Sequence, residues 1–132
     1  MRSISAPLLV CLLSLAFFRA SAQDSTLSVQ DRMVLLNSRI ASADSSHDVL
    51  ASVESRLELA SLARPSQALQ LYQEAIVLTD TAHLSPAVSL RAHRGLVDLF
   101  TGMGEMTKAN REWLHVERFS KEVQKREAME AF

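Results

Sequence analysis

Four histidines are the side chains of this sequence best suited to chemistry near neutral pH, because imidazole titrates there and binds metal ions. They are His47, His83, His93 and His115. A metal site needs several ligands to converge, yet no two of these histidines stand four residues apart on one helix face. We therefore interpret all four as solvated or capping side chains, and we expect no metal.

The acidic and nucleophilic residues of the sequence also form no recognisable catalytic motif. Glu54 and Glu58 stand at i and i+4, which places two carboxylates on one helix face. Such a pair can serve acid–base chemistry, but on a helix surface it is usually a solvated face. The sequence has no Gly-x-Ser-x-Gly, no phosphate-binding glycine loop, no His-Glu-x-x-His and no cysteine cluster. It predicts a protein that is not an enzyme and holds no cofactor.

The elements that must position these side chains are helices. Apolar residues recur at three- and four-residue spacing, and no segment alternates as a strand would. The predicted helices run from about Val29 to Ala43, Asp48 to Ala63, Pro65 to Leu78, Pro86 to Met103, and Met106 to beyond Val123. Residues 79–85 are predicted to form a loop. Short connections between five helices predict an all-α fold of antiparallel helical hairpins.

Parts of this helical pattern repeat along the chain. The spacing small-x3-aromatic-x2-small occurs twice. It is found at Ala68, Tyr72 and Ala75, and again 41 residues later at Ala109, Trp113 and Val116. A weaker match, offset by 36 residues, aligns Ile40, Asp44, His47 with Ile76, Asp80, His83. A small residue lets two helices approach, and the aromatic residue fills the gap against the next hairpin. We therefore expect Trp113 to pack in the core rather than to form a ligand platform.

These residues resemble the tetratricopeptide repeat family. The better repeat runs from about Leu90 to Glu117. It has Leu96 at the family's leucine position, Phe100 and Trp113 at its aromatic positions, Gly104 at the turn glycine and Ala109 at the alanine. The earlier repeat, about Val49 to Asp80, keeps Leu57, Ala68, Tyr72 and Ala75 but is two residues shorter at its turn and has no glycine there. The period near 40 exceeds the family's 34. The resemblance implies stacked hairpins in a short α-solenoid.

The resemblance also implies where such a protein binds its partner. The first helix of each hairpin lines a concave surface that takes peptide segments of other proteins. Arg91, Arg94 and Asp98 share one helix face and map onto this surface, and Glu54 and Glu58 map onto it in the earlier repeat. Two arginines could hold a carboxylate or an acidic segment. The alternative is ordinary surface charge.

The first 22 residues have the pattern of a secretory signal peptide. Arg2 supplies a positive charge, residues 8–18 form an apolar run, and Ala20-Ser21-Ala22 is a small-x-small cleavage pattern. The apolar run is shorter than the roughly 20 residues of a membrane-spanning helix. Cleavage would leave a flexible stretch at residues 23–27 and a helical domain at residues 28–132. We therefore expect an exported protein, periplasmic or secreted.

Composition narrows the partners of the exported chain. All 15 acidic residues follow the leader, whereas two of the 14 basic residues, Arg2 and Arg19, fall within it. The remaining net charge of −3, without a block of like charges, argues against nucleic acid. The single cysteine, Cys11, lies in the leader, so no disulfide is expected. No later apolar run is long enough to span a membrane.

Three functions remain open from the sequence. The leading hypothesis is a non-enzymatic exported scaffold that binds a protein or peptide, or a second copy of itself, because apolar residues of the segment 116–132 lack a following helix. The second is a sensory input module, since a leader followed by such repeats resembles the extracytoplasmic region of certain bacterial sensor histidine kinases; the chain would then be the front piece of a longer protein. The third is an enzyme or small-ligand carrier built on a helical bundle. It requires a pocket with convergent polar groups, which the sequence does not show.

Overall fold

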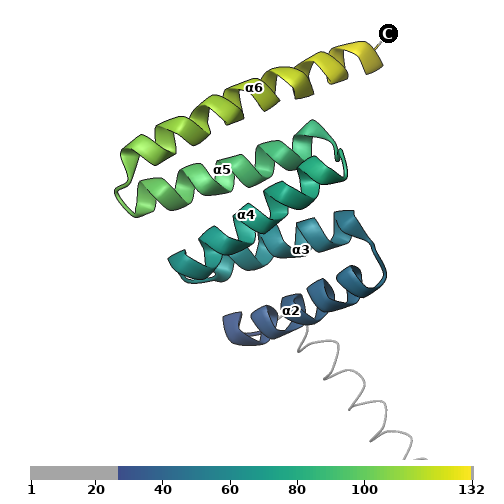
Figure 1. Ribbon diagram of the computed structural model, residues 1–132, viewed down its shortest axis with the longest axis vertical. Helices are drawn as coiled ribbons and strands as arrows, with labels where there is room; N and C mark the ends of the chain where they lie inside the picture. Colours follow the sequence, from purple (N-terminus) through teal and green to yellow (C-terminus); the bar gives the residue numbers. More distant parts are fainter. Residues whose placement is uncertain (1–26, 132) are drawn as a thin grey trace, which may run out of the picture. The chain divides into compact units, whose positions relative to one another are not determined.

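The computed structural model describes residues 27–131, and the expected signal peptide lies outside these residues. The described part is all-helical (Figure 1). Its helices are α2 (Val29–Ser45), α3 (Val49–Leu62), α4 (Pro65–Thr81), α5 (Pro86–Gly102) and α6 (Met106–Glu130). The expected all-α class, with packed neighbouring helices in a repeat-like order, is confirmed. None of these described helices is both long enough and apolar enough to cross a membrane.

Helix starts follow local sequence chemistry. At α3, the Asp48 side chain accepts a hydrogen bond from the Ala51 amide at 3.2 Å, which satisfies one of the unpaired amides of a first helical turn. Pro65 and Pro86 open α4 and α5, where a missing amide proton costs nothing. The prediction that residues 79–85 form a loop is wrong at its start, because α4 continues to Thr81. The buried Thr79 hydroxyl donates to the Ala75 carbonyl at 2.7 Å, which keeps this polar side chain satisfied inside the helix.

Three helix ends share one backbone turn. His47, His83 and Gly104 have positive φ angles of 57°, 53° and 76° and follow α2, α4 and α5. After each of them, the next amide bonds back to a carbonyl five residues earlier: Asp48 to Ala43, Leu84 to Thr79, and Glu105 to Phe100. This is the usual left-handed termination of a helix, for which glycine is preferred. The recurrence of His47 and His83 in the sequence is thus the recurrence of one turn geometry.

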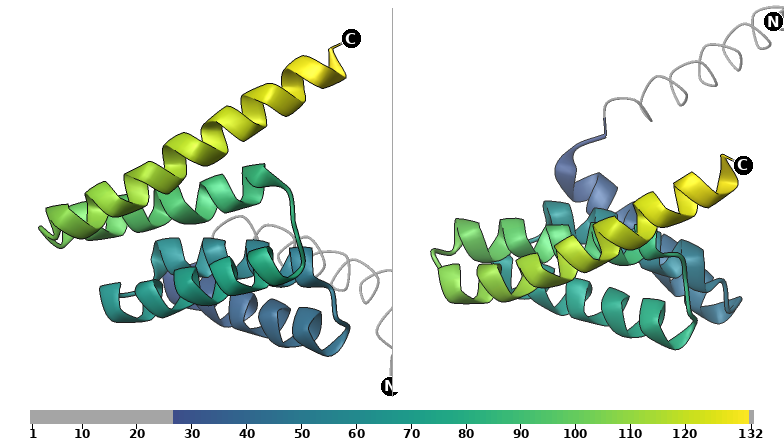
Figure 2. Two further views of the ribbon diagram at one scale, coloured as in Figure 1. Left: turned by 45° about the horizontal axis from the view of Figure 1, so that its top comes forward. Right: turned by 90° about the horizontal axis from the view of Figure 1, so that it is seen from above.

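The chain divides into two compact units between Arg32 and Met33, and the packing described here belongs to the second unit. In it, α3 packs with α4 and α5 packs with α6 as two hairpins, and α4 packs against α5 (Figures 1 and 2). Helix α3 also touches α5, so the first helices of the two hairpins are neighbours. The backbones of α4 and α6 do not approach each other closely. Helix α5 therefore lies against each of α3, α4 and α6.

The core includes most of the side chains that the repeat pattern singled out. Buried in it are Ala68, Tyr72, Ala75, Leu96, Phe100 and Ala109, together with Leu36, Val53, Leu57 and Leu59. The small residues Ala75 and Ala92 are completely buried, which is what close approach of neighbouring helices requires.

The junction of the two hairpins depends on one glycine. A Cβ atom at Gly95 of α5 would overlap the ring of Tyr72 from α4. Tyr72 is 8% exposed, so the ring fills the space that the missing side chain leaves. Burial, and secondarily the charge of Asp98, raises the pKa of the Tyr72 hydroxyl above its usual value of 10.0. The ring is thus held neutral in a tight, largely apolar contact.

Trp113 does not have an equivalent partner, and the prediction that it packs in the core is wrong. It stands at the position of α6 that matches Tyr72 in α4, but it is 48% exposed. Within the described residues no helix follows α6 to supply a second Gly95. Past Val116 no side chain of α6 is fully buried, and the helix diverges from α5 toward its C-terminal end (Figure 2). Exposed Met129 fits the expectation that this end is uncovered.

A charged network fastens α2 to the first hairpin. Arg56 of α3 contacts both carboxylate oxygens of Asp44 at 3.0 and 3.1 Å, and its Nε bonds Glu74 of α4 at 3.1 Å. The Ser52 hydroxyl bonds both Arg56 and Asp44. The bonds from Arg56 and then Ser52 lower the pKa of Asp44 below its usual 3.8, and the bond to Asp44 raises the pKa of Arg56. Bidentate geometry makes this pair more specific than an ordinary surface ion pair.

Replacing Gly95 with alanine should destabilise the protein by about 1–3 kcal/mol, because the added methyl group overpacks the Tyr72 ring. The measurement is urea unfolding followed by circular dichroism. Gly102→Ala is the matched control, since nothing lies within 4 Å of a Cβ there and alanine is the better helix former. In a Tyr72→Leu background the cost of Gly95→Ala should shrink. An unchanged cost in that background would contradict the contact.

The Asp44 carboxylate should stabilise the fold in a pH-dependent way. Its pKa is lower in the folded chain than in the unfolded chain, so its contribution is present above the unfolded value and is lost as pH falls through the folded value. We expect the difference in unfolding free energy between the wild type and Asp44→Asn to be constant near neutral pH and to shrink below the usual aspartate pKa. Urea titrations across this range measure it. A difference that does not vary with pH would contradict a charged pair with Arg56.

Candidate functional site

The residues predicted to face a concave surface do gather on neighbouring helices. Glu54 of α3 and Arg91 of α5 come together across the contact between the first helices of the hairpins, with Oε1 and Nη1 4.0 Å apart. Both side chains are about half exposed, at 51% and 56%. Glu58 lies one turn from Glu54 along α3 and is half-buried. The residues are far apart in sequence, so only the packing of α3 on α5 creates this surface.

Arg94 and Asp98 complete this surface, which we call the α3–α5 face; its residues are Glu54, Glu58, Arg91, Arg94 and Asp98. Arg94 and Asp98 are both exposed on α5. Arg94 forms no ion pair with the described residues, whereas Arg91 is already close to Glu54. The face therefore carries one guanidinium that is available and one that shares its charge with a carboxylate. Arg91 and Arg94 therefore do not form a clamp of two free arginines.

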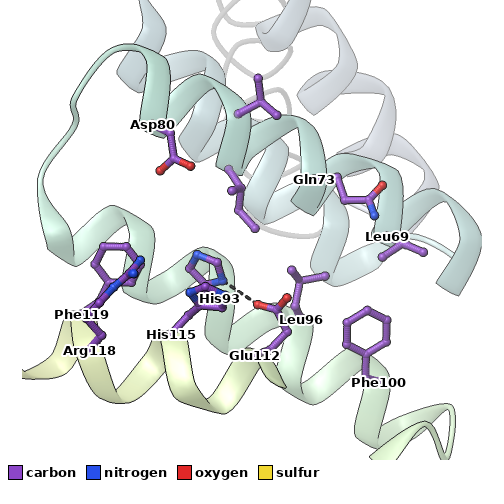
Figure 3. Close-up of a pocket in the computed structure, with 12 residues that line it drawn as sticks. Leu69, Gln73, Asp80, His93, Leu96, Phe100, Glu112, His115, Arg118 and Phe119 are labelled. Atoms are coloured by element: carbon purple, nitrogen blue, oxygen red, sulfur yellow. Dashed lines mark hydrogen bonds and ion pairs between the residues drawn. The ribbon is translucent and has the colours of Figure 1, made fainter. Parts of the chain in front are cut away.

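A groove lies on another side of α5 (Figure 3). Because α4 and α6 both pack on α5 while their backbones stay apart, the groove opens between them with α5 as its floor. The groove has a volume of about 390 Å³. We call it the α4–α6 groove; its lining is Leu69, Gln73, Ile76, Val77 and Asp80 from α4, His93, Leu96 and Phe100 from α5, and Glu112, His115, Arg118 and Phe119 from α6.

The centre of the groove holds a buried histidine. His93 is 8% exposed at its side chain, and its Nδ1 lies 2.6 Å from Oε2 of Glu112 on α6. The imidazole of His115 stacks on His93 with ring centroids 4.6 Å apart, and Phe119 stacks on it at 5.4 Å. The interpretation of all four histidines as solvated or capping is therefore wrong for His93 and His115. The partners are 19 and 22 residues apart, on two helices, so i,i+4 spacing could not find them.

The two ends of the groove differ in chemistry. Leu69 and Phe100 lie at one end, and Asp80 and Arg118 lie at the other, on facing walls (Figure 3). The Arg118 guanidinium sits over the Phe119 ring, 4.7 Å from its centroid. The parallel directions of α4 and α6 explain this order, since each runs from the apolar end of the groove to the charged end. The sequence pattern did not indicate the groove, because its walls come from three helices.

The groove lining combines apolar side chains with a few polar ones. Its lining contains no serine, threonine or cysteine that could act as a nucleophile beside the His93–Glu112 pair. In the described part of the chain, no group of three or more His, Cys, Asp or Glu side chains is placed to hold a metal ion. An apolar floor with a few converging polar groups is the usual composition of a ligand pocket.

No family model, curated protein or solved structure matches this chain. The resemblance to tetratricopeptide repeats thus depends on the residues of this chain and on the helix order that they produce.

Removing the Glu112 carboxylate should destabilise the second hairpin. In Glu112→Ala the nearly buried His93 loses its partner, and an unsatisfied buried polar group costs about 1–3 kcal/mol. Glu117→Ala, an exposed position on the same helix, is the matched control and should change stability by less than about 0.5 kcal/mol. Urea unfolding measures both. Equal effects for the two variants would show that the His93–Glu112 bond contributes nothing special.

Proposed function

We propose that this protein is an exported, non-enzymatic interaction scaffold that binds a segment of another protein through its α3–α5 face, in the manner of tetratricopeptide repeats. The observation that carries the proposal is the meeting of Glu54 and Arg91 across the first helices of two adjacent hairpins. The resemblance places the binding surface on those helices. Export rests on the signal-peptide pattern of residues 1–22.

The charges of the α3–α5 face support an acidic peptide as the bound segment. Arg94 is exposed and without an ion pair among the described residues, and its planar guanidinium can bind a carboxylate through two hydrogen bonds. Arg91 lies three residues earlier on the same helix face and is only loosely held by Glu54, at 4.0 Å. A carboxylate that bridges both arginines would compete with Glu54 for Arg91.

The runner-up is a sensory input module of a two-component signalling protein. One observation favours it, namely the α4–α6 groove, in which polar groups converge beside an apolar floor. A module of this kind has to recognise a small ligand, and the volume of the groove, about 390 Å³, is that of a small-molecule pocket.

The scaffold proposal is tested with fluorescent acidic peptides that end in a free carboxylate, measured by fluorescence anisotropy against the exported chain. We expect Arg94→Glu to weaken binding about tenfold or more, since it replaces a charge-assisted hydrogen bond with repulsion. Arg126→Glu, an exposed position at the far end of α6, is the matched control and should not change it. Binding should also weaken as salt is added.

Two results would count against the scaffold proposal. One is that no acidic peptide binds better than the same peptide with its carboxylates converted to amides. The other is that Arg94→Glu and Arg126→Glu reduce binding equally, which would indicate nonspecific attraction between charges rather than a site.

A further inference from the structure

The α4–α6 groove is separate from the α3–α5 face because the two use opposite sides of α5. The groove takes His93, Leu96 and Phe100 from α5, whereas the face takes Arg91, Arg94 and Asp98. With about 100° between successive helical residues, these two sets point away from each other. A ligand in the groove therefore does not compete with a peptide on the face, and the two sites can be tested independently.

The charged end of the groove holds two opposite charges that do not neutralise each other. Asp80 on α4 and Arg118 on α6 line the same groove from facing walls (Figure 3). Neither forms an ion pair with the other or with any further described residue. Asp80 is exposed, and Arg118 is held only over the Phe119 ring. A carboxylate and a guanidinium left apart across a gap are complementary to a molecule that carries both an ammonium and an anionic group.

The remaining carboxylate of the groove is already engaged. Glu112 lies 2.6 Å from the buried His93 and is 20% exposed at its side chain. An ammonium group in the groove therefore finds Asp80 as the accessible acceptor. His115 and Phe119 each stack on His93 in the lining of the groove.

The charged end of the groove also offers apolar surface to a small ligand. Ile76 lies one turn before Asp80 on α4, Phe119 follows Arg118 on α6, and both line the groove. Burying an aliphatic or aromatic group against such surface is favourable because it removes apolar area from water. The volume of about 390 Å³ falls within the usual range of small-molecule pockets, roughly 300–1,000 Å³.

We propose that the α4–α6 groove binds a small zwitterion with an apolar body, and that the ligand class is the α-amino acids with aliphatic or aromatic side chains. Asp80 pairs with the ammonium, Arg118 pairs with the carboxylate, and the side chain lies against Ile76 and Phe119, the apolar lining residues beside these two charges. The same head-group chemistry occurs in zwitterionic phospholipids, so the test must separate the two sources.

The experiment is isothermal titration of the exported chain with L-phenylalanine and L-leucine. Three analogues each remove one element: 2-phenylethylamine lacks the carboxylate, N-acetyl-phenylalanine lacks the ammonium, and glycine lacks the apolar body. We expect each analogue to bind at least tenfold more weakly than L-phenylalanine. Equal binding of 2-phenylethylamine or N-acetyl-phenylalanine would overturn recognition of the zwitterion, and absence of binding by both amino acids would overturn the proposal outright.

Matched variants locate the site. Asp80→Asn and Arg118→Gln should each weaken binding of L-phenylalanine about tenfold, whereas Glu117→Gln and Arg126→Gln, exposed elsewhere on α6, should leave it unchanged. Circular dichroism confirms that every variant folds. Equal losses in variants and controls would overturn the assignment to this groove.

A final arm addresses the lipid source. The protein is sedimented with vesicles of phosphatidylethanolamine, with and without excess L-phenylalanine. Absence of co-sedimentation supports the free amino acid. Vesicle binding that depends on Asp80 and Arg118, without amino acid binding, would overturn the amino acid as ligand in favour of the lipid head group.

Discussion

The contact between Tyr72 and Gly95 is the constraint on which the rest of this structure depends. Because α5 has no side chain at that point, α4 can approach it closely, and the Tyr72 ring closes the remaining space. The same approach sets α5 beside α3, which brings Arg91 to Glu54. It also fixes the α4 wall of the groove relative to its floor. Both candidate binding surfaces are therefore consequences of one close packing contact.

Helix α5 couples these two surfaces physically. One side of it carries the arginines of the α3–α5 face, and the other carries the buried His93 that holds Glu112 of α6. A ligand that bridges Asp80 and Arg118 would join the walls contributed by both hairpins, and would therefore stabilise their arrangement around α5. In a sensory module this is the kind of difference that ligand binding has to produce, since a ligand shifts only an equilibrium in which it favours one state.

The ring of Trp113 is exposed because no described helix packs over it. Tyr72 is buried because a glycine-bearing helix follows it, and Trp113 occupies the equivalent place on α6 with no such helix among the described residues. Burial in a helical repeat is thus a property of the neighbour as much as of the residue. The same reason explains why the apolar side chains near the end of α6 stay exposed.

The sequence by itself determined the helices and most of the core, because helical periodicity, prolines at the starts of α4 and α5, and the small–aromatic–small triplets are local signals. It also singled out His47 and His83, whose shared turn is a backbone property. The residues of the α3–α5 face were expected from the family resemblance, but the tertiary structure alone decided which side chains meet. Each contact joins two different helices: His93 meets Glu112, Glu54 meets Arg91, and Asp80 faces the wall that carries Arg118. No residue spacing within one helix can predict which side chains of two helices will meet. The exposure of Trp113 was likewise decided by which helices are present to cover it.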